Sequence, residues 1–435
     1  MEKLAPNEDN EVIVIPVSGE ALGENSDEVL YEKFFEDISK TDNRIKFTNT
    51  AKIFKSLKCL KKTYFPGAWM PEHHESVTHP RQFIANNPEA GGIYAKMIYV
   101  HALINNQLRG DKTRKRTALE ELWKAQDSRI FCPGSPSSPG LLHPPVRKAA
   151  YKALLEAEKI TREKGKFSPS LSFFDFDLDG EGEYIFQDDK LNCCVKARGA
   201  GIFELDYLPS SWNYLDTMAP TVIKQNALGT SSMGKRCAFV DWLAPPETLP
   251  ADITPDGIRG GRFCGEEEYE VAETDRLRRK VVFRLAPKAG ALWAEIEIGK
   301  TWQLRKNSLV LEYVLKNTGT QNSAFIFSPS IDLSFPGFGK GFLKLLVLME
   351  SEKEEITPAD AYNIQNIRAL EFHDLKNETV ITLEVNRNFD ALIFQVKSGF
   401  PGMEECQSTC TMPLLPVSLD GGKTWKVTFS LRLGT

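Results

Sequence analysis

The sequence lacks an apolar run long enough to cross a membrane. Its longest such run, residues 345–349, is far short of the roughly 18 residues that a spanning helix needs. The first ten residues are polar and acidic, without the basic start and apolar stretch of a secretory signal. We therefore expect a cytoplasmic protein that does not bind a membrane.

Signals for a zinc site, a disulfide scaffold or a nucleic-acid partner are also missing. The eight cysteines, including the adjacent Cys193 and Cys194, show no CxxC pair and no regular spacing. The net charge of −5 gives no general attraction to nucleic acid, and the one short basic cluster, residues 109–116, lies between two helical patterns. We expect reduced cysteines and no nucleic-acid partner.

The composition is that of a folded protein, with 41% hydrophobic and 26% charged residues. Residues 1–62 alternate short apolar segments with helical patterns, as in a piece of an α/β layer, with a strand at 12–15 and helices near 27–38 and 51–60. Such a piece cannot close a barrel alone. We interpret it as an α/β barrel remnant that packs on the next domain or on another chain.

The next zone, residues 63–166, is predicted to be a helical domain. Apolar residues follow three- and four-residue spacing from Tyr94 to Leu108 and again from Leu119 to Trp123. A third helix is expected to start after Pro144 and Pro145, where proline suits the first turn. Residues 132–145 are rich in Pro, Gly and Ser and are predicted to form a surface loop.

Residues 167–435 read as nearly all β. The clearest alternation runs through residues 292–298 and 309–315, which are separated by a polar turn. Further strands are expected at 281–285, 324–327, 379–384, 391–396 and 425–431. The whole chain is therefore predicted to be a multidomain α+β protein whose C-terminal domain is a large antiparallel β-sandwich.

Five short motifs occur in an order that resembles a known family. They are EELWKAQ (residues 120–126), HPPVRKAAY (143–151), DFDLDG (175–180), FELDY (203–207) and LDT (215–217). This order is similar to the central and C-terminal domains of glycoside hydrolase family 57, which contains 4-α-glucanotransferases and α-amylases. The resemblance implies an incomplete β/α barrel with two catalytic carboxylates, a helical middle and a sandwich like that of galactose mutarotase.

The strand and turn at residues 12–23, VIVIPVSGEALG, resemble the family's acid-bearing strand without its acid. The positions where that carboxylic acid is expected hold Pro16, Val17 and Ser18, none of which can protonate a glycosidic oxygen. Glu20 is the one carboxylate left there and is the sole candidate for a catalytic residue. The strand that bears the family's nucleophile is expected to lie outside this sequence.

The resemblance also suggests residues that contact sugar. The family follows its Trp-x-x-Gln segment, here Trp123 and Gln126, with an aromatic and histidine-bearing loop; this chain keeps Phe131 but has Cys132 and Pro133 beside it. Trp212 and Trp242 lie in loop-like contexts and are candidates for stacking on glucose units. Core packing is the alternative for each of these aromatic side chains.

Oxygen ligands alternate around a glycine turn at Asp175, Asp177, Asp179, Gly180 and Glu183. Hard cations such as Ca²⁺ favour this arrangement. A full EF-hand would need a carboxylate at the twelfth position, where Phe186 stands. We predict a calcium site at Asp175, Asp177, Asp179 and Glu183, with a solvated acidic turn as the alternative.

These observations favour a carbohydrate-related, non-catalytic glucanotransferase-like protein, a pseudoenzyme that binds α-glucan or a partner protein. Two alternatives stay open. The chain is an active or split 4-α-glucanotransferase or α-amylase-like enzyme whose other half is a separate catalytic subunit, or it is a scaffold subunit that docks another protein.

Overall fold

The computed structural model describes most of residues 88–434, together with Lys33, Glu36, Asp37, Lys40, Lys52, Ile84 and Ala85; within 88–434 the exceptions are residues 132–139, 142, 163–166, 218, 226–230, 235, 307, 351, 357–360 and 401–402. The chain divides into two compact units, Met1–Phe65 and Pro66–Thr435. The predicted strand at 12–15, with Glu20, lies outside the described residues. Of the helix predicted at 27–38, Lys33, Glu36 and Asp37 are described, and all three are helical.

Three α-helices follow one another as the hydrophobic spacing predicts. They are α5 (Pro88–Gln107), α6 (Lys112–Lys124) and α7 (Pro144–Thr161), with a short 3₁₀ helix η2 (Ser128–Phe131) after α6. Asp111 caps α6 by accepting the Arg114 N–H at 2.9 Å, and Pro144 opens α7. Their apolar faces, including Ile104, Leu122 and Leu154, form one buried cluster. None of the described helices is long and apolar enough to span a bilayer.

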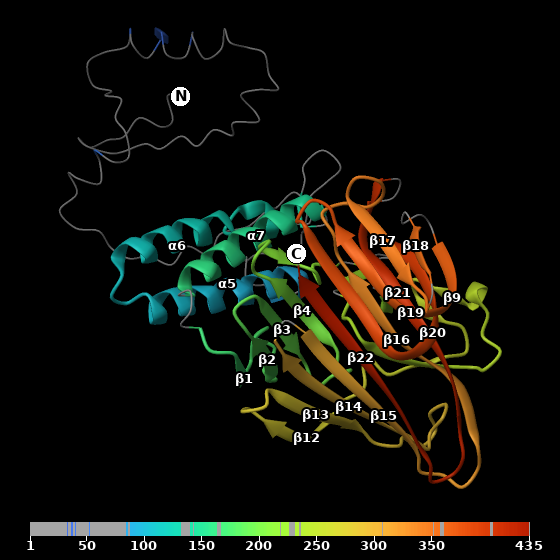
Figure 1. Cartoon of the computed structure of the whole chain (residues 1–435). Helices are drawn as coiled ribbons and strands as arrows, with labels where there is room; N and C mark the ends of the chain where they lie inside the picture. The colour runs from blue at the N-terminus through green and yellow to red at the C-terminus, as the bar shows by residue number, and fades with distance from the viewer. Residues whose placement is uncertain are drawn as a thin grey trace, which may run out of the picture. The chain divides into compact units, whose positions relative to one another are not determined.

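A five-stranded antiparallel sheet follows the helices. Its strands lie in the order β1 (Ser170–Phe174), β2 (Glu183–Gln187), β3 (Leu191–Val195), β4 (Ile202–Tyr207) and β5 (Trp212–Asn213). Helix α7 contacts β5 directly, and Figure 1 shows the group of helices next to this sheet. Two small two-stranded pieces accompany it, β6 (Ala219–Gln225) with β7 (Ser231–Gly234) and β9 (Ile253–Thr254) with β10 (Gly257–Ile258), the latter preceded by the 3₁₀ helix η3 (Pro250–Asp252).

The remaining strands form one continuous antiparallel sheet that folds on itself into a sandwich. The long strand β20 (Thr379–Phe400) pairs with β22 (Thr424–Gly434) through its first part and with β21 (Met403–Leu419) through its second. The predicted strands at 379–384 and 391–396 are therefore two parts of a single strand. The other members are β8 (Val240–Ala244), β11 (Arg262–Phe263), β12 (Glu270–Asp275), β13 (Lys280–Leu285), β14 (Ile296–Arg305), β15 (Ser308–Asn317), β16 (Ser323–Leu333), β17 (Leu343–Leu348), β18 (Lys353–Ile356) and β19 (Ala361–Asp374).

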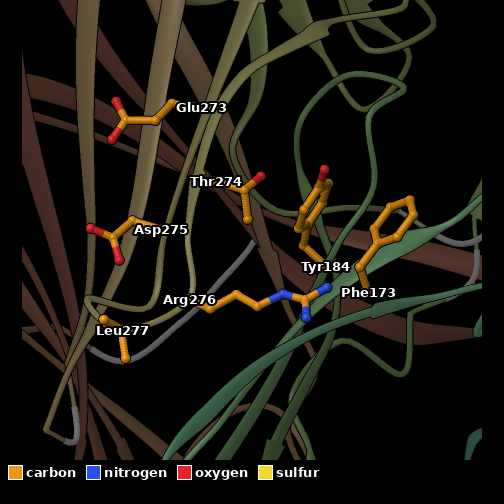
Figure 2. Close-up of a pocket in the computed structure, with 7 residues that line it drawn as sticks. All are labelled: Phe173, Tyr184, Glu273, Thr274, Asp275, Arg276 and Leu277. Atoms are coloured by element: carbon orange, nitrogen blue, oxygen red, sulfur yellow. The ribbon is translucent and has the colours of Figure 1, made fainter.

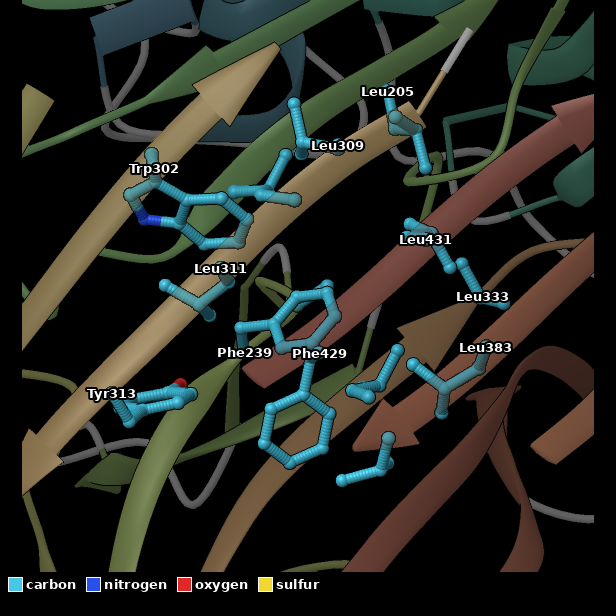
Figure 3. Close-up of a cluster of buried hydrophobic side chains, with 14 of the residues drawn as sticks. Leu205, Phe239, Trp302, Leu309, Leu311, Tyr313, Leu333, Leu383, Phe429 and Leu431 are labelled. Atoms are coloured by element: carbon cyan, nitrogen blue, oxygen red, sulfur yellow. The ribbon is translucent and has the colours of Figure 1, made fainter. Parts of the chain in front are cut away.

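Strict alternation along β14 and β15 builds the sandwich core. Leu309, Leu311 and Tyr313 are buried on one face of β15, as predicted, and Trp302 joins them from β14. Figure 3 shows these side chains meeting Phe239, Phe429 and Leu431. The strand expected from residue 292 begins only at Ile296, because residues 289–295 form turns in which Trp293 has a φ of 50°. The predicted helical region and large antiparallel sandwich are confirmed for the described residues, whereas the predicted barrel remnant, residues 1–62, lies almost entirely outside them.

Candidate functional site

The acidic turn predicted to bind calcium connects β1 to β2. The two carboxylate oxygens of Asp175 accept the backbone N–H groups of Asp179 and Gly180, each at 3.1 Å. Gly180 has a φ of 98°, which a residue with a side chain rarely adopts, so glycine allows the chain to reverse here. The repeated Asp-x-Asp spacing therefore folds as a loop that is closed by hydrogen bonds to Asp175.

Three of the four predicted metal ligands converge. The carboxylate oxygens of Asp175, Asp177 and Glu183 lie within 4.8 Å of one another. Because Ca²⁺ binds oxygen at about 2.3–2.6 Å, ligand atoms around it are separated by up to about 5 Å. The Oδ1 atom of Asp177 is buried and has no hydrogen-bond partner among the described residues. Asp179 lies outside this set, and its Oδ1 accepts the Glu181 N–H at 2.8 Å.

The electrostatics of the turn favour a cation. Burial raises the pKa of Glu183 to about 7, and the neighbouring carboxylates of Asp177 and Asp179 add to the rise. The backbone N–H of Phe176 donates a hydrogen bond to Glu183 Oε2 at 2.6 Å, which lowers the pKa and partly opposes this rise. Burial likewise raises the pKa of Asp177, against the attraction of Lys196. A bound divalent ion would relieve this crowding of partly desolvated negative charge. The donor set therefore fits a hard, oxygen-preferring metal ion.

Three of the predicted sugar-contacting residues belong to the helical region. Trp123, on the last turn of α6, is 56% exposed, and Gln126 is exposed in the turn that follows. Phe131 ends η2 and packs partly buried against the helical core. Trp123 and Gln126 are thus accessible to a ligand, whereas much of the Phe131 ring is used in packing.

The two predicted tryptophans of the β region differ in accessibility. Trp212 lies in β5 rather than in a loop, is only 9% exposed and donates its Nε1–H to the carbonyl of Ser334 at 3.0 Å. Its position favours core packing over sugar stacking. Trp242, on β8, is half-buried and lies beside the partly exposed ring of Phe263, with centroids 4.7 Å apart. Of the two, Trp242 keeps a surface that a sugar could reach.

The structure also reveals buried charges that the sequence did not assign to a site. Lys96 on α5 donates to Asp206 at 2.6 Å and to Glu204 at 3.2 Å, both on β4, and Tyr151 on α7 donates to Glu204 at 3.2 Å. Burial raises the pKa of Asp206 to about 6 against the attraction of Lys96. The FELDY motif could have indicated this acidic pair, because alternation along a strand turns Glu204 and Asp206 to the same face.

A second ion pair lies nearby. Arg147 of α7 is buried and donates to Asp216 at 2.9 Å and to Gln407 of β21 at 2.6 Å. Glu204, Asp206 and Asp216 are only 1%, 2% and 3% exposed, so water and sugar do not reach them in this structure. Both clusters therefore join the helices to the sheets, and neither presents an accessible acid.

Comparisons with known proteins identify a related family and a shared fold. Residues 175–220, from the acidic turn through β5, match the model of the alpha-amylase/4-alpha-glucanotransferase C-terminal family. The 4-alpha-glucanotransferase of Thermococcus litoralis shares the fold, with a TM-score of 0.59 and 16% identity over 81% of this chain and 52% of that one. This chain thus spans about half the length of that protein.

Smaller proteins align with part of the chain at lower TM-scores. A galactose mutarotase related enzyme from Lactobacillus acidophilus aligns over 58% of this chain and 97% of its own, with 12% identity and a TM-score of 0.40. A galactose mutarotase-like protein from Lactobacillus casei aligns over 58% and 100%, with 13% identity and a TM-score of 0.38. No curated protein sequence matches the chain.

Proposed function

We propose that this protein is a non-catalytic, glucanotransferase-like protein that binds α-glucan. The observation that carries the proposal is the match of residues 175–220 to the glucanotransferase C-terminal family. The fold shared with a 4-alpha-glucanotransferase over 81% of the chain supports it. The assignment to glycoside hydrolase family 57 and a cytoplasmic location belong to the same proposal.

Two features support a loss of catalysis. A retaining glycosidase needs two carboxyl groups about 5 Å apart on either side of an accessible sugar. Residues 12–23 carry no acid where the family's acid is expected. Among the described residues, Glu204 and Asp206 are neighbours, but they are buried and bound to Lys96. Their burial supports a structural role rather than proton transfer.

We further propose that the acidic turn holds a calcium ion. Asp175, Asp177 and Glu183 would supply the carboxylate ligands, and the ion would neutralise their charge and stiffen the β1–β2 connection. Asp179 would act by closing the turn through its bond to Glu181. In this role the ion stabilises the sheet and takes no part in a reaction.

Affinity electrophoresis tests the glucan proposal. The purified chain is run in native gels that contain glycogen, amylose or no polysaccharide, with cellulose-derived oligosaccharides as competitors for linkage specificity. We expect slower migration in the glycogen and amylose gels alone. Unchanged migration in both would refute α-glucan binding and leave a scaffold role that docks another subunit.

The question of catalysis requires a separate measurement. Incubation with maltooligosaccharides should leave their length distribution unchanged. Disproportionation or hydrolysis by the purified chain would instead support the active-enzyme alternative, and activity that appears only after a separate catalytic subunit is added would support the split enzyme.

A further inference from the structure

A groove lies where the edges of two sheets meet. β1 is the edge strand of the five-stranded sheet, and β12 is the edge strand of the sandwich sheet. The groove has a volume of about 630 Å³ and is lined by Phe173 and Tyr184 on one side and by residues 273–277 on the other. Its size is within the range of small-ligand sites, about 300–1,000 Å³. Figure 2 shows the two sides facing each other.

One side of the groove offers an aromatic surface held in place. Phe173 is 51% exposed, and its ring centroid lies 4.8 Å from that of Tyr184, with 43° between the planes. A side chain at Gly182 would lie within 2.3 Å of the Phe173 ring, so this glycine makes room for the ring. Tyr184 is itself fixed by edge-to-face packing on Phe283 at 5.5 Å. The half-exposed Phe173 side chain is therefore held in place while it stays accessible to solvent.

The other side offers hydrogen-bonding groups. Figure 2 shows Arg276 directed toward Phe173 and Tyr184, whereas Glu273 and Asp275 point the opposite way. Glu273 is paired with Lys280 at 3.0 Å, and Asp275 accepts the Arg278 N–H at 2.9 Å. Among the described residues, the Arg276 side chain makes no hydrogen bond or ion pair. Its guanidinium donors are therefore available to a ligand in the groove.

We infer that this groove binds a glucosyl unit of an α-glucan chain. Phe173 would stack on the apolar C–H face of the sugar, and Arg276 would donate to two adjacent hydroxyl oxygens, for which its planar fork is suited. Thr274 offers a hydroxyl on the Arg276 side of β12. The inference rests on the proposed function and names the surface that carries it.

The groove suits an uncharged sugar better than an anion. A single exposed guanidinium attracts an anion weakly in water. The carboxylates of Glu273 and Asp275 lie on the same strand and reduce the positive potential. The exposed ring beside Arg276 contributes contact that does not depend on charge. An open groove between sheet edges also lets a polymer chain extend beyond it.

Titration calorimetry with maltoheptaose, using the full chain, tests the site. Phe173→Ala and Arg276→Ala should each weaken binding about tenfold, as expected for the loss of a stacking contact or of charge-assisted hydrogen bonds. Arg259→Ala removes an 82% exposed arginine outside the groove and should bind like the parent protein. Sodium phosphate should not weaken maltoheptaose binding any more than sodium chloride at the same ionic strength does.

The possible results separate the site from the function. Binding that survives in both groove variants but is lost in Trp123→Ala or Trp242→Ala would overturn the groove and preserve α-glucan binding. Absence of binding to the parent protein would refute both. Arg276 lies on an exposed hairpin, so its variant remains informative if Phe173→Ala is poorly folded. Competition by phosphate would reassign the groove to anionic ligands.

Discussion

The proposed calcium site in the acidic turn can be tested at a single carboxylate. Asp177 contributes a buried oxygen without a partner to the set formed with Asp175 and Glu183, whereas Asp179 lies outside it. We expect millimolar Ca²⁺ to raise the melting temperature of the parent protein, because a ligand that binds only the folded state stabilises it. Asp177→Asn removes one negative charge from the ligand set and should sharply reduce this rise. Differential scanning fluorimetry with and without Ca²⁺ measures the effect.

Asp179→Asn is the matched control for that experiment. It makes the same chemical change two residues away, and its side-chain oxygen can still accept the Glu181 N–H. This variant should keep most of the Ca²⁺-dependent rise. A parent protein whose melting temperature does not respond to Ca²⁺ would contradict the calcium site and favour a solvated acidic turn.

Lys148 on α7 is a buried cation without a close carboxylate among the described residues. Its Nζ donates to the Phe335 carbonyl and lies 5.4 Å from the Trp212 ring centroid. Burial lowers the pKa of Lys148 to about 8, although Asp216 opposes the change. Between pH 8 and the unfolded pKa near 10.5, the unfolded chain holds the proton and the folded chain releases it. The free energy of unfolding therefore rises with pH in this window.

We expect Lys148→Met to remove that contribution. The stability of the parent protein relative to the variant should increase by about 2–3 kcal/mol between pH 8 and pH 10.5, because each unit of pKa shift corresponds to about 1.4 kcal/mol. Urea unfolding of both proteins across this range measures the difference, and subtraction cancels the titration of other groups. A constant difference would show that Lys148 titrates normally.

The contacts of individual residues could be predicted from the sequence where both partners lie close together in the chain. The turn from Asp175 to Glu183 is closed by hydrogen bonds between residues that are near neighbours in the chain. The spacing of its aspartates was enough to predict the turn. Lys96 was not predictable as a partner of Asp206, because 110 residues separate them. No local pattern identifies such a partner, and a lysine on a helix is usually solvated.

At the scale of elements, periodicity predicted the helices and strands better than their ends. The proline pair at residues 144–145 correctly placed the start of α7, and alternation identified β15. The sequence Asn386-Arg387-Asn388 resembles a turn, yet β20 runs through it. Its partner changes from β22 to β21 at this point. Pairing with distant strands therefore overrides the local preference of these polar residues.

At the scale of the whole molecule, buried charges join the described helices to the sheets. Lys96 connects α5 to β4, and Arg147 connects α7 to Asp216 and to Gln407 of β21. Burial lowers the pKa of Lys96, but the carboxylates of Asp206 and Glu204 more than offset this and keep it above the usual value. The helices and the sheets within residues 66–435 also form one compact unit. We infer that they open together.

Lys96→Met tests this cooperation, because it leaves Glu204 and Asp206 buried without their cation. Loss of one partner from a buried ion pair costs about 3–5 kcal/mol. If the helices and sheets open as one unit, amide hydrogen exchange should accelerate by the same factor in α5, α7, β3 and β4. Lys112→Met, at an exposed position on α6, should leave exchange unchanged. Acceleration confined to α5 would show that the helix opens independently and that the ion pairs do not couple the two layers.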